Sequence, residues 1–240
     1  MAPKSTPQQT ASARRFRRRL LAWFGRHARE LPWRRTRDPY RILVSEVMLQ
    51  QTPVSRVVEY YPRFLAAFPS LRRLAGAPPQ CVREAWQGLG YYRRATNLQR
   101  LAHAVVAEHN GRIPPDLAAL RELPGVGRYT AGAVASFAFE QRVPAVDTNV
   151  ARVLRRAFQP RPASGARGEQ RLWEIATALL PRHGAAAWRF NQAIMELGAL
   201  ICTARVARCE RCPVVTVCRT GKKREPATVN REREKPARRS

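Results

Sequence analysis

Lysine is almost absent from this 240-residue chain. Lysine and arginine together number forty-four, but the lysines are only Lys4, Lys222, Lys223 and Lys235. No primary amine side chain therefore stands between residues 4 and 222, which disfavours mechanisms that need an internal lysine nucleophile or Schiff base. Acidic residues are also few, seventeen in all, so the formal net charge is +27. A positive charge of this size concentrates polyanions around the protein, and nucleic acid is the first partner that it predicts.

Long apolar runs are missing as well. No stretch approaches the roughly eighteen apolar residues of a membrane span, and the polar, Arg-rich N-terminus has no apolar stretch of a signal peptide. Both absences predict an intracellular protein, nucleoid-associated in the cytoplasm, with no membrane partner. Cysteine is scarce, and five is an odd number for a secreted disulfide framework. Four cysteines crowd into one C-terminal segment, which indicates metal ligation, whereas Cys81 is predicted to be a small core residue of an amphipathic helix.

The apolar spacing is helical throughout, as in Phe16, Leu20 and Phe24, and no period-two strand pattern is convincing. Proline and glycine divide the chain into about ten short helices, with Pro62 among the predicted breaks. The predicted fold class is therefore all-α. Residues 1–13 are predicted to be a disordered N-terminus, residues 159–168 a surface loop, and residues 219–240 a basic tail.

The strongest motif is the cysteine segment. Cys202, Cys209, Cys212 and Cys218 lie within seventeen residues, with spacings of six, two and five intervening residues. Four thiolates can close around one zinc ion or one [4Fe-4S] cluster. Zinc ribbons usually contain two close Cys-x2-Cys pairs, and only one such pair exists here. The spacing therefore favours the iron-sulfur cluster over zinc.

A second motif is the sequence LPGVG at residues 123–127, which precedes an apolar helix. Gly125 and Gly127 allow a tight backbone turn that exposes N–H groups at a helix N-terminus, where the dipole favours a DNA phosphate. This is the logic of a helix-hairpin-helix motif. Taken alone, the same five residues could form any tight turn between helices.

Two carboxylates stand out. In a helix over residues 40–52, Glu46 shares its face with Ile42, Leu43 and Leu49, and desolvation there would raise its pKa toward that of a general acid. The alternative is a boundary glutamate paired with an arginine. Asp147 is predicted, with Thr148 as the other choice, to be the N-cap of the following helix. Capping alone could explain Asp147, but a second carboxylate is also what cleavage of a glycosidic bond demands.

Two further segments carry groups suited to DNA. Gln50, Gln51 and Thr52 are uncharged hydrogen-bonding residues that could read base edges or fill a gap in the base stack. The sequence GLGYYRR at residues 88–94 places two aromatic residues and two arginines beside a Gly-rich turn. It could wedge into DNA or simply pack.

Seven segments in order make the chain similar to the MutY-type adenine DNA glycosylases of the helix-hairpin-helix/endonuclease III superfamily. They are LPWR (31–34), SEVMLQQT (45–52), GLGYY (88–92), LPGVGRYTAGA (123–133), VDTNVARVL (146–154), NQAIMELGA (191–199) and the cysteine spacing. The resemblance implies a helical barrel domain with the hairpin at residues 31–148. It also implies a cluster domain made of residues 14–30 and 149–218, with the active site in the cleft between the domains. It implies a [4Fe-4S] cofactor, a monomer, and double-stranded DNA with a mispaired base as the partner.

The resemblance also assigns roles by motif. Glu46 would protonate the flipped adenine, Asp147 would stabilise the sugar cation, and Tyr129 and Asn149 would support that step. The residues implied to line or position the adenine pocket are Trp33, Arg34, Leu49 and Glu196. Those implied to touch the disturbed base stack or the backbone are Gln51, Thr52, Tyr91, Gly125 and Gly127.

The resemblance further predicts the type of reaction. Relatives with lyase activity carry lysine where this chain has Tyr129, so a monofunctional glycosylase that leaves an abasic site is expected. MutY proteins usually carry a further C-terminal domain that recognises 8-oxoguanine, and this chain ends twenty-two residues after Cys218, so that domain is expected to be lacking. The predicted function is hydrolysis of adenine mispaired with G or 8-oxoguanine. The alternatives are a mismatch thymine or uracil glycosylase and a non-catalytic iron-sulfur DNA-binding protein.

Overall fold

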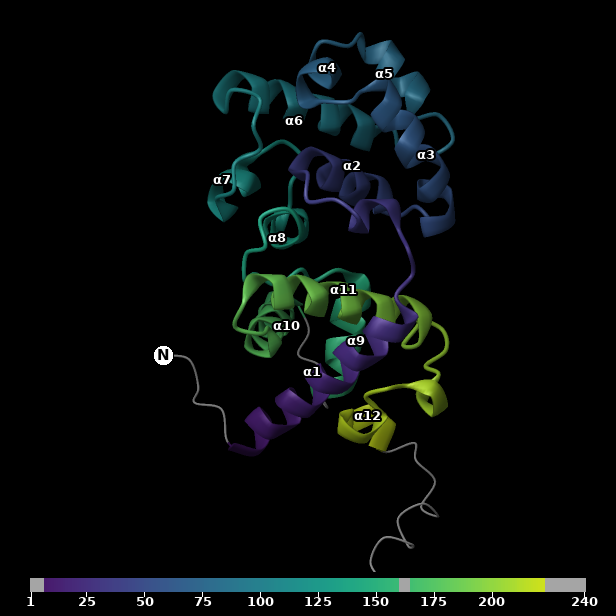
Figure 1. Ribbon diagram of the computed structural model, residues 1–240, viewed down its shortest axis with the longest axis vertical. Helices are drawn as coiled ribbons and strands as arrows, with labels where there is room; N and C mark the ends of the chain where they lie inside the picture. Colours follow the sequence, from purple (N-terminus) through teal and green to yellow (C-terminus); the bar gives the residue numbers. More distant parts are fainter. Residues whose placement is uncertain (1–6, 160–164, 223–240) are drawn as a thin grey trace, which may run out of the picture. The chain divides into compact units, whose positions relative to one another are not determined.

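The computed structural model describes residues 7–159 and 165–222, and their regular structure is helical (Figure 1). Within those ranges the backbone forms twelve α-helices and three short 3-10 helices, with an isolated β-bridge between Cys202 and Ala207. The prediction of an all-α fold is therefore confirmed for the described part of the chain. In that part, no helix combines the length and the apolar character that crossing a membrane requires.

The chain divides into two compact units. The middle unit contains Ala28–Val146 and Leu180–Asn191, and the terminal unit contains the described parts of Met1–His27, Asp147–Leu179 and Gln192–Ser240. Residues 180–191 differ from the sequence-based division, which placed them with the C-terminal part. Their hydrogen bonds give the reason: Asn191 Nδ2 donates to Ser136 Oγ and to the Val143 carbonyl, both at 2.9 Å. Helix α11 (Gly184–Leu200) thus contributes residues to both units.

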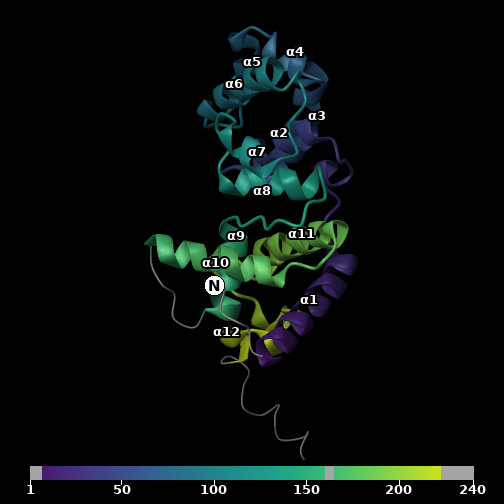
Figure 2. The ribbon, with the colours of Figure 1, turned by 90° about the vertical axis from the view of Figure 1, so that its left-hand side faces the viewer.

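The middle unit is a cluster of short helices around an aromatic core. Helix α2 packs on α3, α6 and α8, helix α6 packs on α4 and α5, and α7 packs on α8 (Figures 1 and 2). Phe64 and Trp86 are fully buried in this core, with ring centroids 5.5 Å apart. The elements are η1 (Pro32–Arg34), α2 (Pro39–Leu49), α3 (Val54–Ala67), α4 (Leu71–Ala75), α5 (Pro79–Ala85), α6 (Arg93–Glu108), α7 (Leu117–Glu122) and α8 (Arg128–Phe137).

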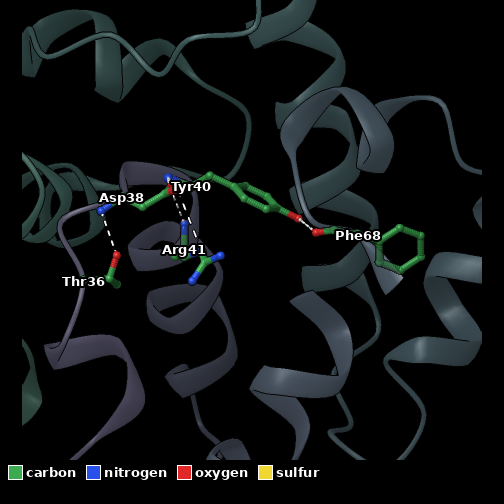
Figure 3. Close-up of polar contacts among 5 residues, drawn as sticks. All are labelled: Thr36, Asp38, Tyr40, Arg41 and Phe68. Carbon is green, nitrogen blue, oxygen red and sulfur yellow. Dashed lines mark hydrogen bonds and ion pairs between the residues drawn. The ribbon is translucent and has the colours of Figure 1, made fainter. Parts of the chain in front are cut away.

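Helix α2, which carries Glu46, is fixed at its start by local hydrogen bonds (Figure 3). The Asp38 carboxylate caps it by accepting from the backbone N–H groups of Tyr40 and Arg41, at 2.8 and 3.0 Å. Pro39 occupies the first helical position, where its missing N–H costs nothing. The Tyr40 hydroxyl donates to the Phe68 carbonyl at 2.6 Å, so it ties α2 to the end of α3. Burial raises the pKa of Tyr40, which keeps the phenol protonated as a donor.

We expect Tyr40→Phe to lower the free energy of unfolding by about 1–2 kcal/mol, because the buried Phe68 carbonyl loses its donor while the ring still packs. Chemical denaturation of both proteins at neutral pH measures the difference. Tyr92→Phe is the control, since Tyr92 is exposed and should give no comparable change. Equal stability of Tyr40→Phe and the wild type would contradict a structural role for this bond.

The terminal unit joins segments from both ends of the chain. Phe16 of α1 meets Phe158 of α9 edge-on at 5.0 Å, and Arg17 Nη1 donates to the Leu179 carbonyl at the end of α10, at 3.3 Å. Helix α1 spans Pro7–His27, so residues 7–13 are helical and their prediction as a disordered segment is wrong. Gln8, Gln9, Ala11 and Ala13 favour helix there. The other elements are α9 (Thr148–Phe158), α10 (Gly165–Leu179), η2 (Cys209–Arg211), η3 (Val215–Val217) and α12 (Arg219–Lys222).

Three other local predictions need correction. Helix α3 continues through Pro62, because buried Tyr61 and Phe64 anchor it on both sides of the proline. Helix α10 already begins at Gly165, inside the predicted 159–168 loop, of which residues 160–164 lie outside the described residues. Cys81 is exposed rather than part of the core, because α5 is only seven residues long and turns Val82 inward instead. Of the predicted basic tail, residues 219–222 form α12 and the rest lies outside the described residues.

Candidate functional site

Glu46 and Tyr129 meet inside the middle unit. Glu46 lies near the C-terminal end of α2 and is only 4% exposed, as its predicted apolar face requires. Tyr129 is the second residue of α8, which packs on α2. The Tyr129 hydroxyl donates to Glu46 Oε2 at 2.6 Å. A phenol hydrogen-bonded to a buried carboxyl fixes the direction in which that carboxyl can give or take a proton.

The LPGVG turn joins α7 to α8 as a helical hairpin. Gly125 has φ +78°, and a Cβ at this position would lie 3.0 Å from Asn97 Cβ, so glycine meets both the conformation and the space. Gly127 is the N-cap residue of α8, and no side chain caps this helix. Because Gly127 has no side chain, an anion can approach the positive N-terminal end of the α8 dipole without steric hindrance from that residue.

Two turns of the middle unit present side chains to solvent. Gln51, just after α2, and Tyr91, just before α6, are exposed and have positive φ angles of 56° and 47°. Tyr91 is 62% exposed, the largest value among the exposed large hydrophobic side chains of the described residues. Thr52 beside Gln51 is buried, and its hydroxyl lies 3.4 Å from the Leu89 carbonyl. The left-handed backbone at both turns is strained for residues other than glycine, which is common at functional positions.

The three pocket residues predicted in the middle unit lie in η1 and at the end of α2. Trp33 in η1 is buried and meets Tyr61 edge-on at 5.6 Å. Arg34 donates to the Arg29 carbonyl at 3.0 Å. Leu49 is half-buried and is the last residue of α2, one turn after Glu46.

Asp147 is the N-cap of α9, as predicted. It belongs to the terminal unit, whereas the sequence-based division placed it in the domain of residues 31–148. Its Oδ1 accepts from the Val150 N–H at 2.7 Å, and its Oδ2 accepts from Asn149 Nδ2 at 2.8 Å. Burial raises the pKa of Asp147, although the hydrogen bonds from Val150 and Asn149 oppose that shift. The carboxylate is therefore held in one orientation at an energetic cost, as is typical of reactive groups.

Asn149 is itself held from two sides. Arg152 Nη2 donates to Asn149 Oδ1 at 2.7 Å. A Cβ on Gly198 of α11 would lie 2.7 Å from Asn149 Cβ, so the close approach of α9 and α11 depends on that glycine. Glu196, on the part of α11 that belongs to the terminal unit, is 1% exposed.

The four C-terminal cysteines line one small pocket in the terminal unit, together with Arg156 and Gly221. The Arg156 guanidinium donates to Cys202 Sγ at 3.3 Å, and the Gly221 N–H donates to Cys218 Sγ at 3.4 Å. Burial raises the pKa of Cys212 to about 12 and also raises that of Cys218. A set of four sulfur donors suits a soft metal centre. Within the described residues, no group of three or more His, Cys, Asp or Glu side chains is arranged around a single metal ion.

Sequence reasoning missed two arginines on α9. Arg152 Nε donates to the Cys202 carbonyl at 2.8 Å, and Arg152 Nη2 also donates to the Gly198 carbonyl at 2.7 Å. Arg156 donates to the Thr203 carbonyl at 2.8 Å in addition to Cys202 Sγ. Asn149, Arg152 and Arg156 follow the i, i+3, i+7 spacing of one helix face. That spacing is the sequence feature that could have indicated that these three side chains contact neighbouring segments from the same face of α9.

The predicted site residues therefore form two groups with internal contacts. Glu46 and Tyr129 are joined in the middle unit, and Asp147 and Asn149 are joined in the terminal unit. Comparison with known protein families gives a match over more than half of the chain. A model of the "HhH-GPD superfamily base excision DNA repair protein" matches residues 44–177.

The chain belongs to the HhH-GPD superfamily. This result confirms the superfamily and the fold that the seven segments indicated. Among solved structures, a thermostable thymine-DNA glycosylase shares this HhH-GPD fold with a TM-score of 0.80 and 31% identity, covering 89% of this chain and 98% of that one. An endonuclease III in a trapped covalent intermediate with DNA gives a TM-score of 0.77 at 27% identity, covering 90% and 99%.

Among curated HhH-GPD relatives, the adenine DNA glycosylase of Mycobacterium tuberculosis is 48% identical over 196 residues. The match covers 81% of this chain and 64% of that relative. The chain thus spans less than two thirds of the length of this relative.

Proposed function

We propose that this HhH-GPD protein is a monofunctional adenine DNA glycosylase that hydrolyses the N-glycosidic bond of adenine mispaired with G or 8-oxoguanine. The observation that carries the proposal is the 2.6 Å hydrogen bond from Tyr129 to Glu46. It provides a buried, oriented proton donor for a base, and it puts a phenol rather than an amine at the start of α8. The name of the 48% identical relative supports adenine as the base.

The proposed chemistry separates the roles of the two carboxyl groups. Glu46 protonates the adenine, which makes the base a better leaving group. Asp147 stabilises the positive charge that develops on the sugar as the glycosidic bond breaks. Asn149 fixes Oδ2 of Asp147, and Tyr129 fixes Oε2 of Glu46, so both carboxyl groups are preorganised before substrate arrives.

The proposed DNA contacts follow from exposure and from helix polarity. Gly125 and Gly127 place the N-terminus of α8 at a phosphate of double-stranded DNA. Gln51 and Tyr91 enter the base stack, because both are exposed on strained turns. The side chains that we propose for the adenine pocket, or for support of it, are Trp33, Arg34, Leu49, Thr52 and Glu196.

Single-turnover base release tests the function directly. The substrates are duplexes with A opposite 8-oxoguanine, A opposite G, and T or U opposite G, each analysed with and without alkaline cleavage. The proposal predicts release from the adenine duplexes, with strand breaks that appear only after alkali. Strand breaks without alkali would instead show lyase activity.

A second candidate function is removal of thymine from mismatches with G. The 31% identity to a thymine-DNA glycosylase over nearly the whole length of that protein favours it. The same duplex panel separates the two candidates, because a mismatch thymine glycosylase would release T or U and leave adenine in place.

We further propose that Cys202, Cys209, Cys212 and Cys218 hold a [4Fe-4S] cluster. Four sulfur donors around one pocket fit such a group, as do the N–H donors from Arg156 and Gly221 that point at sulfur. When bound, the cluster would cross-link the segment after α11 and so stabilise the terminal unit. Zinc remains the competing occupant of the same four ligands.

We expect Cys212→Ser to abolish the visible absorbance of the purified protein and to lower its iron content from about four atoms per chain. We also expect a lower melting temperature, because the loop loses its cross-link. Cys81→Ser is the matched control, since Cys81 is exposed and far from the pocket in sequence, and it should retain iron and colour. A colourless wild-type protein that contains one zinc per chain would contradict the cluster.

A further inference from the structure

Arg94 is a buried charge in the first turn of α6. It is 9% exposed, although the sequence motif around it suggested a DNA wedge. Its Nη1 donates to the carbonyl oxygens of Val47, Met48 and Gln50, with the first two at 3.0 and 2.8 Å. Its Nη2 donates to Thr52 Oγ1 at 2.9 Å and to the carbonyl oxygens of Leu89 and Gly90, both at 3.1 Å. None of these six acceptors is a carboxylate, so the hydrogen bonds to this buried charge all come from carbonyl and hydroxyl dipoles.

The six acceptors belong to two segments that are far apart in sequence: the end of α2 with the turn that follows it, and the turn that precedes α6. Gln50 and Thr52 flank Gln51 on one side, and Leu89 and Gly90 directly precede Tyr91 on the other. The ring of Tyr91 lies 5.5 Å from the guanidinium carbon, and the ring of Trp86 lies 5.4 Å from it. Trp86 Nε1 also donates to the Gly90 carbonyl at 3.2 Å. One guanidinium thus touches the immediate neighbours of both exposed, left-handed residues.

We infer that Arg94 is a positioning residue that clamps the Gln51 turn to the Tyr91 turn and sets the distance between these two side chains. It acts through hydrogen bonds within the protein and does not contact a DNA phosphate. Its effect on base extrusion rests on the proposed function, whereas the clamp itself is a property of the DNA-free protein.

The chemistry of the clamp requires arginine. A guanidinium is a planar fork whose two terminal nitrogens can serve two sets of acceptors at once. A lysine ammonium is a single point with three donors, so it can satisfy the carbonyls of one turn but cannot span both. Arg94→Lys therefore keeps the charge and loses the bridge.

Hydrogen–deuterium exchange in the absence of DNA tests the clamp. We expect Arg94→Lys to raise the exchange rates of amides in residues 50–52 and 88–92 by about tenfold, because opening of these turns becomes easier by roughly the strength of one charged hydrogen bond. Arg100→Lys is the matched control on the same helix, since Arg100 is exposed, and it should leave both turns unchanged. Unchanged exchange in Arg94→Lys would overturn the clamp.

A fluorescent duplex tests the consequence. In a duplex with 2-aminopurine beside a non-hydrolysable 2′-fluoro adenosine opposite 8-oxoguanine, unstacking raises the fluorescence. We expect Arg94→Lys to reduce the fluorescence gain about tenfold, while its affinity for an undamaged duplex and the salt dependence of that affinity stay within about twofold of the wild type. If Arg94 instead bound a DNA phosphate, the result would be the reverse. Arg94→Lys would then change mainly the affinity for duplex DNA and would leave the fluorescence gain close to that of the wild type.

A second variant covers the case in which Arg94→Lys does not fold, as judged by circular dichroism. Thr52→Val removes one acceptor of the clamp, keeps Arg94, and should raise exchange in the same two turns by a smaller factor. No rise in Thr52→Val would then overturn the proposal. If the wild type releases no adenine, the proposed function fails, but the exchange experiment still decides the clamp.

Discussion

Glu46→Gln should lower the single-turnover rate of adenine release by about 10² to 10⁴, the usual contribution of a general acid. Glutamine has the shape of glutamate, and its amide oxygen can still accept the hydrogen bond from Tyr129. The packing of α2 on α8 is therefore kept, while the proton that the leaving base needs is lost. Base release is measured from a duplex with A opposite 8-oxoguanine under enzyme excess.

Binding separates this result from loss of structure. Glu46→Gln should retain salt-sensitive affinity for duplex DNA, since Glu46 is buried and the DNA is held mainly through phosphate contacts. Glu59→Gln, an exposed change on α3, is the control for losing one negative charge and should keep full activity. If Glu46→Gln releases adenine at the wild-type rate, Glu46 is not the general acid. If the wild type itself releases no base, the non-catalytic DNA-binding alternative is favoured.

Asp147→Asn should also be severely impaired, with a loss of base release of at least about 10², because a neutral amide cannot stabilise a developing cation as a carboxylate does. Asparagine is as good an N-cap as aspartate, so α9 should stay capped at the Val150 N–H. The matched control is Asp116→Asn. Asp116 caps α7 in the same manner, accepting from the Ala119 N–H at 2.8 Å, and its replacement should leave activity intact. Equal losses in both variants would point to capping rather than chemistry.

The raised pKa of Asp147 adds a pH signature in stability. A carboxyl whose pKa is higher in the folded than in the unfolded protein contributes stability below its unfolded pKa. That contribution is lost as the pH rises through the folded pKa. The free energy of unfolding of the wild type, relative to Asp147→Asn, should therefore fall as the pH increases from about 4 toward neutrality. Urea denaturation across this range measures it, and a relative stability that increases with pH would show that Asp147 is not penalised by burial.

The features that sequence could predict are those set by neighbours along the chain. The capping role of Asp147 follows from its position before an apolar helix, and the burial of Glu46 follows from the spacing of Ile42 and Leu43. The Gly125 turn follows from its glycines. In each case the residues that decide the outcome lie within one or two turns of helix.

The features that sequence missed depend on backbone groups elsewhere. The burial of Arg94 could not be predicted from the GLGYYRR segment, which fits a DNA wedge as well as packing, because the partners of Arg94 are mostly carbonyl oxygens, which any residue supplies. Arg152 also donates to carbonyl oxygens of a distant segment, those of Cys202 and Gly198, and its spacing from Asn149 and Arg156 along α9 was the only sign of this in the sequence. Cys81 was misplaced because a seven-residue helix has too few turns for its apolar face to be read. Hydrogen bonds from a side chain to distant backbone carbonyl oxygens can be identified only once the three-dimensional structure is known.

The division of the chain into units also orders its folding during synthesis. The middle unit is built mostly from one continuous stretch, so it can form while the ribosome is still translating the rest. Helix α1 emerges first but cannot dock then, because the partner of Arg17 is the Leu179 carbonyl, 162 residues later. At about 5–20 residues per second, α1 waits roughly 10 to 30 s for that partner. During this interval the apolar stripe of Phe16 and Leu20 has no surface to cover it, so the first helix made is among the last to be buried.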